Sequence, residues 1–299
     1  MVSVRRHIEP NSRESERAWG SSKNYLADFT ERVELGKTLT ESGLKIAEAG
    51  TGTSIFDPVL CELVYRWFCI KGGHILDPFA GGSVRGIVAA YLGYKYTGLD
   101  LRPEQVEANE TQAAAIVPDN CPRWIVGDSR NIKELAAGEY DLIFSCPPYY
   151  DLEVYSDDGR DLSTATTYDE FLTVYRDIIE QSVSMLKDNR FACFVVGDIR
   201  DKQGFYRGFP SHTRAAFESA GAHLYNEAVL VTAVGSLPIR VGKQFGGYRK
   251  LGKTHQNVLV FYKGNPKNIK ETFGEIVVDA AEIERMATAF PGIEIERIT

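Results

Sequence analysis

The sequence predicts a doubly wound α/β fold built on a seven-stranded, mostly parallel sheet. From residue 55 onward, short apolar runs alternate with segments of helical spacing, which is typical of βαβ units. Glycine-rich or acidic turns follow the first three apolar runs, at the places where such sheets bind ligands. The last two runs have no long helix between them. We therefore expect them to form an antiparallel hairpin at the edge of the sheet.

The bulk composition indicates a globular protein without disulfides. The 299 residues, 43% of them hydrophobic and 25% charged, suffice for one sizeable core. Five scattered cysteines without a CxxC pair predict reduced thiols and no zinc site, and no other metal site is legible. The chain shows neither a signal-peptide pattern nor an apolar run of membrane length. These features predict a soluble protein of the cytoplasm.

Three regions follow one another along the chain. Residues 1–50 are polar and predict an N-terminal arm, residues 51–270 carry the periodic pattern of the main domain, and residues 271–299 form a C-terminal extension. In the extension, residues 280–289 predict a helix, and a final strand is expected near Ile293. The main domain opens with a helix that Asp57 caps and Pro58 begins.

The remaining elements of the main domain follow from apolar periodicity. Seven strands are predicted at His74–Leu76, Lys95–Leu99, Pro122–Val126, Tyr140–Ser145, Arg190–Val196, His223–Val231 and Asn257–Tyr262. Five helices are predicted at Val84–Leu92, Pro103–Ile116, Ile132–Ala136, Tyr168–Leu186 and Ser211–Ala220.

The ends of the first three strands carry residues suited to a nucleoside ligand. The turn 77–83 is rich in glycine and precedes a helix, so its backbone can approach a ligand closely. Asp100 ends the second strand, where an acid can accept both hydroxyls of a ribose, and Asp128 follows the third, where it can meet an adenine amine. Each feature alone also fits an ordinary turn, and together they favour a binding site.

The fourth strand ends in the segment 145–150, which reads Ser-Cys-Pro-Pro-Tyr-Tyr. Two prolines there break any continuing strand or helix and hold an extended loop at the carboxyl edge of the sheet. Because ligands bind at that edge, the segment is a candidate catalytic loop.

The paired motifs Asp77–Gly82 (Asp-Pro-Phe-Ala-Gly-Gly) and Cys146–Tyr149 (Cys-Pro-Pro-Tyr) resemble those of the DNA amino-methyltransferases that act on adenine or cytosine. The resemblance covers roughly residues 51–264 and fits the branch in which the cofactor motif precedes the catalytic loop. It implies a Rossmann-like class I methyltransferase fold, S-adenosylmethionine as cofactor and double-stranded DNA as partner. The implied cofactor-binding residues are Phe56, Asp77, Phe79, Gly81, Asp100 and Asp128.

The resemblance also implies how the catalytic loop works. An exocyclic amine is a weak nucleophile because its lone pair is delocalised into the ring. The backbone carbonyl of Pro147 and the side chain before it accept the amine hydrogens, while Tyr149, after Pro148, stacks on a base flipped out of the duplex. This chain has Cys146 where the family usually has Asp, Asn or Ser, and a thiol is a weak acceptor. Ser145 is expected to point to the other face and not to replace it.

A basic segment lies late in this acidic chain, whose net charge is −7. No Asp or Glu occurs between Ala228 and Lys270, and glycines and aromatics are interleaved with the cations. The segment 232–256 therefore predicts either a loop that grips DNA phosphates or an ordinary solvated loop. The candidate DNA-binding residues are Arg240, Lys243, Arg249, Lys250 and Lys253.

Other functions remain open at this point. Related Pro-Pro-Tyr loops also serve RNA and protein-amide methyltransferases, and weakened amine activation at Cys146 would fit a catalytically silent nucleic-acid-binding module. Adenine and cytosine are equally compatible with the sequence as targets.

Overall fold

The computed structural model describes residues 3–4, 56–150, 158–231 and 237–276. The side chains of residues 237–240 and 243 lie outside this description. The strands are β1 Ser3–Val4, β2 His74–Asp77, β3 Lys95–Asp100, β4 Arg123–Val126, β5 Tyr140–Ser145, β6 Leu186–Val196, β7 His223–Val231 and β8 His255–Lys263. The longer helices are α2 Pro58–Phe68, α3 Val84–Tyr91, α4 Pro103–Ile116, α6 Tyr168–Met185, α7 Phe209–Ser219 and α8 Leu237–Tyr248. Short helices are α5 Ile132–Leu135, α9 Ile269–Phe273 and the 3-10 turns η2 Pro118–Asn120, η3 Ser129–Asn131, η5 Leu162–Thr164 and η6 Pro266–Asn268.

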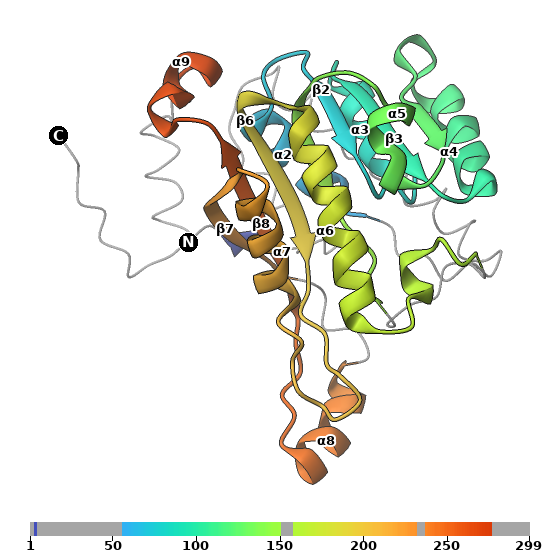
Figure 1. The fold of residues 1–299 in the computed structure, drawn as a ribbon, viewed down its shortest axis with the longest axis vertical. Coiled ribbons are helices and arrows are strands. Elements are labelled where there is room, and N and C mark those ends of the chain that lie inside the picture. The colour runs from blue at the N-terminus through green and yellow to red at the C-terminus, as the bar shows by residue number, and fades with distance from the viewer. Residues whose placement is uncertain (1–2, 5–55, 151–157, 232–236, 277–299) are drawn as a thin grey trace, which may run out of the picture. The chain divides into compact units, whose positions relative to one another are not determined.

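The strands form one sheet in the order β1-β7-β8-β6-β5-β2-β3-β4 (Figure 1). Neighbours from β6 to β4 pair in parallel, and β8 is antiparallel to both β6 and β7. The chain builds outward from β2 in one direction through β3 and β4, and then in the other through β5 and β6. The predicted doubly wound, mostly parallel sheet with an antiparallel hairpin is thereby confirmed.

One detail of the sheet differs from the prediction. An eighth strand, β1, pairs in parallel with β7 and extends the sheet by one strand, because Ser3–Val4 supplies backbone groups that β7 would otherwise leave unpaired. The antiparallel strand β8 lies between β6 and β7, so β7 with β1 forms this edge of the sheet.

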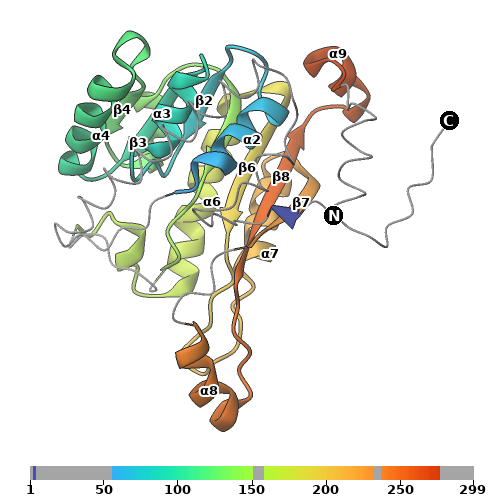
Figure 2. The same ribbon diagram turned by 180° about the vertical axis from the view of Figure 1, so that it is seen from behind.

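Helices cover both faces of the sheet. In Figure 1, α6 and α7 lie in front of the strands, and α2 comes to the front in the reverse view of Figure 2. The predicted cap at Asp57 is present, with its carboxylate accepting hydrogen bonds from the Val59 and Leu60 amides. Helix α6 begins with a capping box between Thr167 and Glu170. Among the described residues, no helix has the length and apolar character needed to span a bilayer.

Aromatic rings fill the core between α6, α7 and the sheet. Tyr175 of α6 packs against Phe209 of α7 at 5.2 Å between ring centroids, and Phe217 stacks on Phe261 of β8 at 4.0 Å. These four side chains are almost completely buried. Such packing fixes α6 and α7 against β8 of the sheet. The candidate catalytic loop leaves from the end of β5.

The segment 232–256 is not the loop that the sequence predicted. Helix α8 occupies Leu237–Tyr248 although it contains three glycines, each of which costs about 1 kcal/mol in a helix. The helix ends at Arg249, whose φ of 54° reverses the chain and whose amide bonds to the Phe245 carbonyl at 2.9 Å.

The chain divides into two compact units, residues 1–6 with 52–269 and residues 7–51 with 270–299. The sheet belongs entirely to the first unit. The helix and strand expected near residues 280–289 and 293 lie outside the described residues, as does most of the predicted N-terminal segment 1–50. The predicted boundaries at residues 50 and 270 stay predictions.

Candidate active site

The predicted site residues gather at the carboxyl ends of β2, β3, β4 and β5. These strands are adjacent and parallel, so the turn 77–83, Asp100, Asp128 and the loop 146–149 lie along one edge of the sheet. Phe56, which precedes α2, joins them by packing its ring edgewise on Phe144 of β5, with centroids 5.7 Å apart.

Asp77 is the hub beneath this edge. Its side chain is fully buried and accepts four hydrogen bonds. One carboxylate oxygen accepts from the Phe79 amide at 3.1 Å and from Ser145 Oγ at 2.5 Å. The other accepts from Arg85 Nε at 2.6 Å and from the Tyr96 hydroxyl at 2.7 Å. Its carboxylate thus holds the turn 77–83 and the start of the candidate catalytic loop together. The contact of Asp77 with the cofactor stays a prediction.

Arg85 is the partner of Asp77 that the sequence analysis missed. Arg85 Nη2 donates to the carbonyls of Phe79 and Ala80, both at 2.7 Å. The Arg85 guanidinium lies 4.7 Å from the centre of the Phe56 ring. Burial alone would lower the pKa of Arg85, and the Asp77 carboxylate more than offsets this and raises it. A single charged residue inside an otherwise apolar helix was the available signal.

The glycine turn meets Asp100 directly. The Gly81 amide donates to the Asp100 carboxylate at 3.0 Å, and the Arg102 amide donates to its other oxygen at 2.9 Å. Gly81 has a φ of 52°, which favours glycine, and a Cβ placed on Gly81 or Gly82 would meet no atom of the described residues within 4 Å. Open space therefore borders the turn beside a half-buried carboxylate. Burial raises the pKa of that Asp100 carboxyl.

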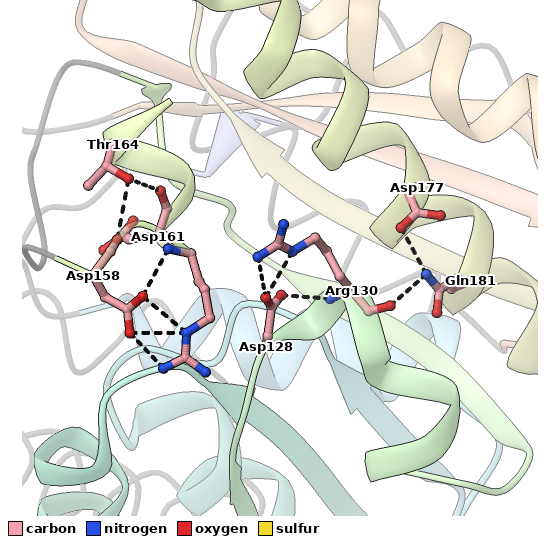
Figure 3. Close-up of polar contacts among 8 residues, drawn as sticks. Asp128, Arg130, Asp158, Asp161, Thr164, Asp177 and Gln181 are labelled. Carbon is pink, nitrogen blue, oxygen red and sulfur yellow. Dashed lines mark hydrogen bonds and ion pairs between the residues drawn. The ribbon is translucent and has the colours of Figure 1, made fainter. Parts of the chain in front are cut away.

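Asp128 forms an ion pair with Arg130, a second residue that the sequence analysis missed (Figure 3). One carboxylate oxygen accepts from the Arg130 amide at 2.9 Å, and the other from Arg130 Nε and Nη2 at 2.8 and 2.5 Å. The Arg130 carbonyl in turn accepts from Gln181 of α6 at 2.8 Å. The acid predicted to meet an adenine amine thus has one oxygen bonded to a guanidinium and the other to a backbone amide.

A second ion pair, between Asp158 and Arg160, lies in the acid-rich segment that follows the candidate catalytic loop. Asp158 accepts hydrogen bonds from the Arg160 amide and guanidinium, which lower the pKa of Asp158 to about 2. Asp161 caps η5 through the Ser163 amide at 2.8 Å, and Thr164 Oγ1 donates to the carbonyls of both acids. Figure 3 shows this turn beside Asp128 and Arg130. Residues 151–157 lie outside the description.

The candidate catalytic loop brings Cys146 and Tyr149 together. Pro147 is buried, and Cys146, Pro148 and Tyr149 are half-buried. Cys146 Sγ lies 3.9 Å from the Tyr149 hydroxyl. Burial, with Cys146 as a smaller cause, raises the pKa of Tyr149 well above its ordinary value, so the phenol keeps its proton. Ser145 donates its hydroxyl to Asp77, and the expectation that it does not replace Cys146 stays a prediction.

Gln256 at the start of β8 is the third residue that the sequence analysis missed. Its Nε2 donates to the Tyr149 hydroxyl at 2.7 Å across 107 residues of sequence. The Tyr149 ring also packs edgewise on Phe209, with centroids 6.0 Å apart. After Tyr149 the backbone turns sharply, because Tyr150 takes a φ of 49°, a conformation that costs energy for a non-glycine residue. No local sequence signal connects Gln256 to this loop.

Three of the candidate DNA-binding residues, Arg249, Lys250 and Lys253, lie in the segment that follows α8, and their role stays a prediction. Arg249 caps α8 by donating to the carbonyls of Phe245 and Gly246 at 3.1 and 2.9 Å. Burial lowers the pKa of Lys253, and Lys250 is half-buried. The side chains of Arg240 and Lys243 lie outside the described residues.

Several solved structures follow a similar chain path. TrmN from Thermus thermophilus is 18% identical with a TM-score of 0.47, over 70% of this chain and 49% of TrmN, so the chain spans about half the length of that protein. A methyltransferase from Pyrococcus furiosus is 16% identical with a TM-score of 0.47, over 78% and 100% of the two chains. The magnesium protoporphyrin IX methyltransferase from Synechocystis PCC 6803, solved with bound SAM, is 12% identical with a TM-score of 0.42, over 83% and 89%.

No family model matches the sequence, and no curated protein matches it. The fold itself is defined by the strand order and by the antiparallel β8 inserted between β6 and β7. This is the Rossmann-like class I methyltransferase fold that the sequence predicted. The substrates named for the similar structures belong to those proteins, and similarity at this level assigns none of them to this chain.

Proposed function

We propose that this protein is an S-adenosylmethionine-dependent methyltransferase that modifies the exocyclic amine of adenine or cytosine in DNA, in a base flipped out of the helix. The observation that carries the proposal is the junction at Asp77. One carboxylate ties the turn 77–83 to Ser145, the residue that precedes Cys146. A cofactor turn and an amine-accepting loop are thereby held side by side at the ligand-binding edge of the sheet.

The residues of the turn fit the proposed cofactor. The open space at Gly81 and Gly82 leaves the backbone accessible, and Asp100 presents a half-buried carboxylate that can accept ribose hydroxyls. Phe56, held between Phe144 and the Arg85 guanidinium, adds an apolar wall. When bound there, S-adenosylmethionine would supply an electrophilic methyl group on its sulfonium.

The loop 146–149 supplies groups for the target amine. The Pro147 carbonyl is a strong acceptor on a backbone that two prolines make stiff. Cys146, whose Sγ lies 3.9 Å from the Tyr149 hydroxyl that Gln256 holds, occupies the position of the second acceptor beside the Pro147 carbonyl. Both can orient the amine so that its lone pair points to the methyl carbon, and correct alignment of reacting atoms supplies a large part of such rate accelerations.

Two other functions are compatible with a weak acceptor at Cys146 or with the Pro-Pro-Tyr loop. A chain that binds the cofactor and a nucleic acid without transferring a methyl group would be a catalytically silent module. An RNA or protein-amide substrate would use the same Pro-Pro-Tyr loop. These readings differ in the product that forms, so one product assay separates them.

The assay is transfer of a labelled methyl group from S-adenosylmethionine to duplex DNA, followed by digestion to nucleosides and mass spectrometry. We expect N6-methyladenine or N4-methylcytosine. Cys146→Ser should keep or raise the rate, because a hydroxyl is the better acceptor. Label that appears only in RNA or protein, or in no product despite cofactor binding, would overturn the proposal.

A further inference from the structure

We infer that the projection beside the candidate active site is a stacking surface for an unpaired strand of DNA, an inference that rests on the proposed function. We call this projection the arm and define it as the segment 198–207 together with residues 241–254. Figures 1 and 2 show α8 projecting beyond the ends of the strands, at the end of the sheet where the loop after β6 also lies.

The arm is rooted at the catalytic loop. Its two ends leave the sheet at Gly197, after β6, and at Gln256, in β8. A Cβ on Gly197 would lie 3.8 Å from the Tyr149 ring and 3.9 Å from the Gln256 side chain. Gln256 bonds to the Tyr149 hydroxyl at 2.7 Å. A ligand held along the arm would therefore reach the loop that we assign to the target base.

One half of the arm is a small hairpin. Arg200 and Tyr206 pair across it, the Asp201 amide bonds to the Phe205 carbonyl at 2.8 Å, and Gly204 takes the positive φ that the turn requires. This geometry leaves Phe205 70% exposed and Tyr206 48% exposed. Large apolar rings at the tip of a short, ordered hairpin contribute little to the core.

The other half is α8 and the segment after it. Tyr248 is 76% exposed, Leu251 is 72% exposed and Phe245 is 45% exposed. A Cβ on Gly204 would lie 2.7 Å from Lys250 Nζ, so the tip of the hairpin touches the segment that follows α8. The two halves form one surface.

Cations accompany the rings of this surface. The Arg200 guanidinium lies 3.8 Å from the centre of the Tyr206 ring, Arg249 lies 5.6 Å from that of Phe245, and Lys250 Nζ lies 5.7 Å from that of Tyr248. A ring with a cation beside it can stack on a base while the cation meets the adjoining phosphate.

The acids near the arm are engaged by its own backbone. Asp201 Oδ1 accepts from the amides of Gly204 and Phe205 at 2.7 and 2.9 Å. Asp198 Oδ1 accepts from three amides, those of Ile199, Gly208 and Phe209. The second half of the arm contains no acid, because none occurs between Ala228 and Lys270. The surface is thus complementary to a polyanion.

The exposed rings decide between a paired and an unpaired strand. A closed duplex presents phosphates but hides the faces of its bases, so lysines and arginines would suffice to bind it. Rings gain stacking energy only on bases whose faces are accessible. Ordered, exposed rings at the rim of the proposed base-binding loop therefore fit an unpaired strand, whose base faces are accessible on both sides of the target base.

The test is binding of fluorescein-labelled 20-nucleotide DNA to the full chain, followed by fluorescence anisotropy at two salt concentrations. The same sequence is used as single strand, as duplex and as RNA. We expect the single-stranded DNA to bind most tightly. The double variant F205A/Y248A should bind it more weakly by roughly tenfold per ring. Its salt dependence should not change, because no phosphate contact is removed.

Trp67→Ala is the matched control, since Trp67 is 42% exposed on α2, outside the arm. Thermal melting followed by circular dichroism verifies that each variant is folded. The inference is overturned if F205A/Y248A binds like the wild type, if Trp67→Ala weakens binding equally, or if duplex or RNA binds more tightly than single-stranded DNA. Methyl transfer to DNA is measured separately. Transfer without dependence on the rings removes this inference alone, and ring-dependent binding without transfer removes the proposed function alone.

Discussion

The two loops that meet at the candidate active site are fixed in different ways. The turn 77–83, which we propose binds the cofactor, is held by Asp77 and Arg85. Asp77 is fully buried and accepts four hydrogen bonds, and Arg85 donates hydrogen bonds to two carbonyls of the turn. The catalytic loop is stiffened by Pro147 and Pro148 and is held at Tyr149 by a hydrogen bond from Gln256 and a 3.9 Å sulfur contact.

This difference separates stability from activity. Changes under the cofactor turn leave a buried charge without its partner and should act on the whole fold. Changes around Tyr149 remove a contact from a half-buried, largely preformed loop and should act on turnover. Variants of the two regions can therefore test whether the contacts of Asp77 stabilise the fold and whether the contact at Tyr149 affects turnover.

The largest effect is expected for Arg85→Met. Removing the guanidinium leaves the Asp77 carboxylate buried and short of one partner, which should lower the free energy of unfolding by about 3–5 kcal/mol. Urea denaturation measures this. The matched control is Arg66→Met, because Arg66 forms an exposed pair with Glu62 whose loss should cost at most about 0.5 kcal/mol. Equal losses of unfolding free energy in the two variants would show that the Asp77–Arg85 pair stabilises the fold no more than the exposed pair does.

Asp100→Asn comes next. It removes the charge that would accept ribose hydroxyls, and a charge-assisted hydrogen bond is worth about 1.5–3 kcal/mol. We expect the affinity for S-adenosylmethionine to fall by roughly tenfold to a hundredfold, measured by isothermal titration calorimetry. Asp119→Asn, at an exposed carboxylate on η2, serves as control and should bind like the wild type. An unchanged affinity in Asp100→Asn would remove Asp100 from the cofactor site.

The parts of the structure that the sequence predicted are those with local signals. The helix Pro103–Ile116 and the strands Tyr140–Ser145 and His223–Val231 match the prediction at both ends, because proline starts and apolar runs mark them. Asp77, Asp100 and Cys146–Tyr149 were placed at one edge because parallel strands bring their ends together.

The rest depended on contacts between distant side chains. Arg85 and Tyr96 converge on Asp77 from a helix and a neighbouring strand, and Gln256 reaches Tyr149 from 107 residues away. Neither convergence has a spacing rule. Helix α8 was missed for the opposite reason, since its glycines give a strong local signal for a loop that the fold overrides.

A smaller effect is expected for Gln256→Leu. Leucine keeps the volume but cannot donate to the Tyr149 hydroxyl, so the phenol loses its fixed direction beside Cys146. The turnover number for DNA methylation should fall by about tenfold, the equivalent of one hydrogen bond, while KM changes little. Asn257→Leu on the same strand is the control, because Asn257 bonds to exposed Glu227 and not to the loop. A change in KM with constant kcat would place Gln256 in substrate binding instead.

The smallest effect concerns pH. Burial raises the pKa of Tyr149 well above its ordinary value of about 10, so its phenol stays protonated where an exposed tyrosine would begin to ionise. With saturating substrates, kcat should therefore stay within about a factor of two between pH 8 and 10. Initial rates of the wild type and of Tyr149→Phe, which has no ionisable group at this position, should follow the same profile. A fall near pH 10 in the wild type that Tyr149→Phe lacks would mean that the phenol titrates normally. The hydroxyl would then be exposed to water, and the hydrogen bond from Gln256 would not keep it buried.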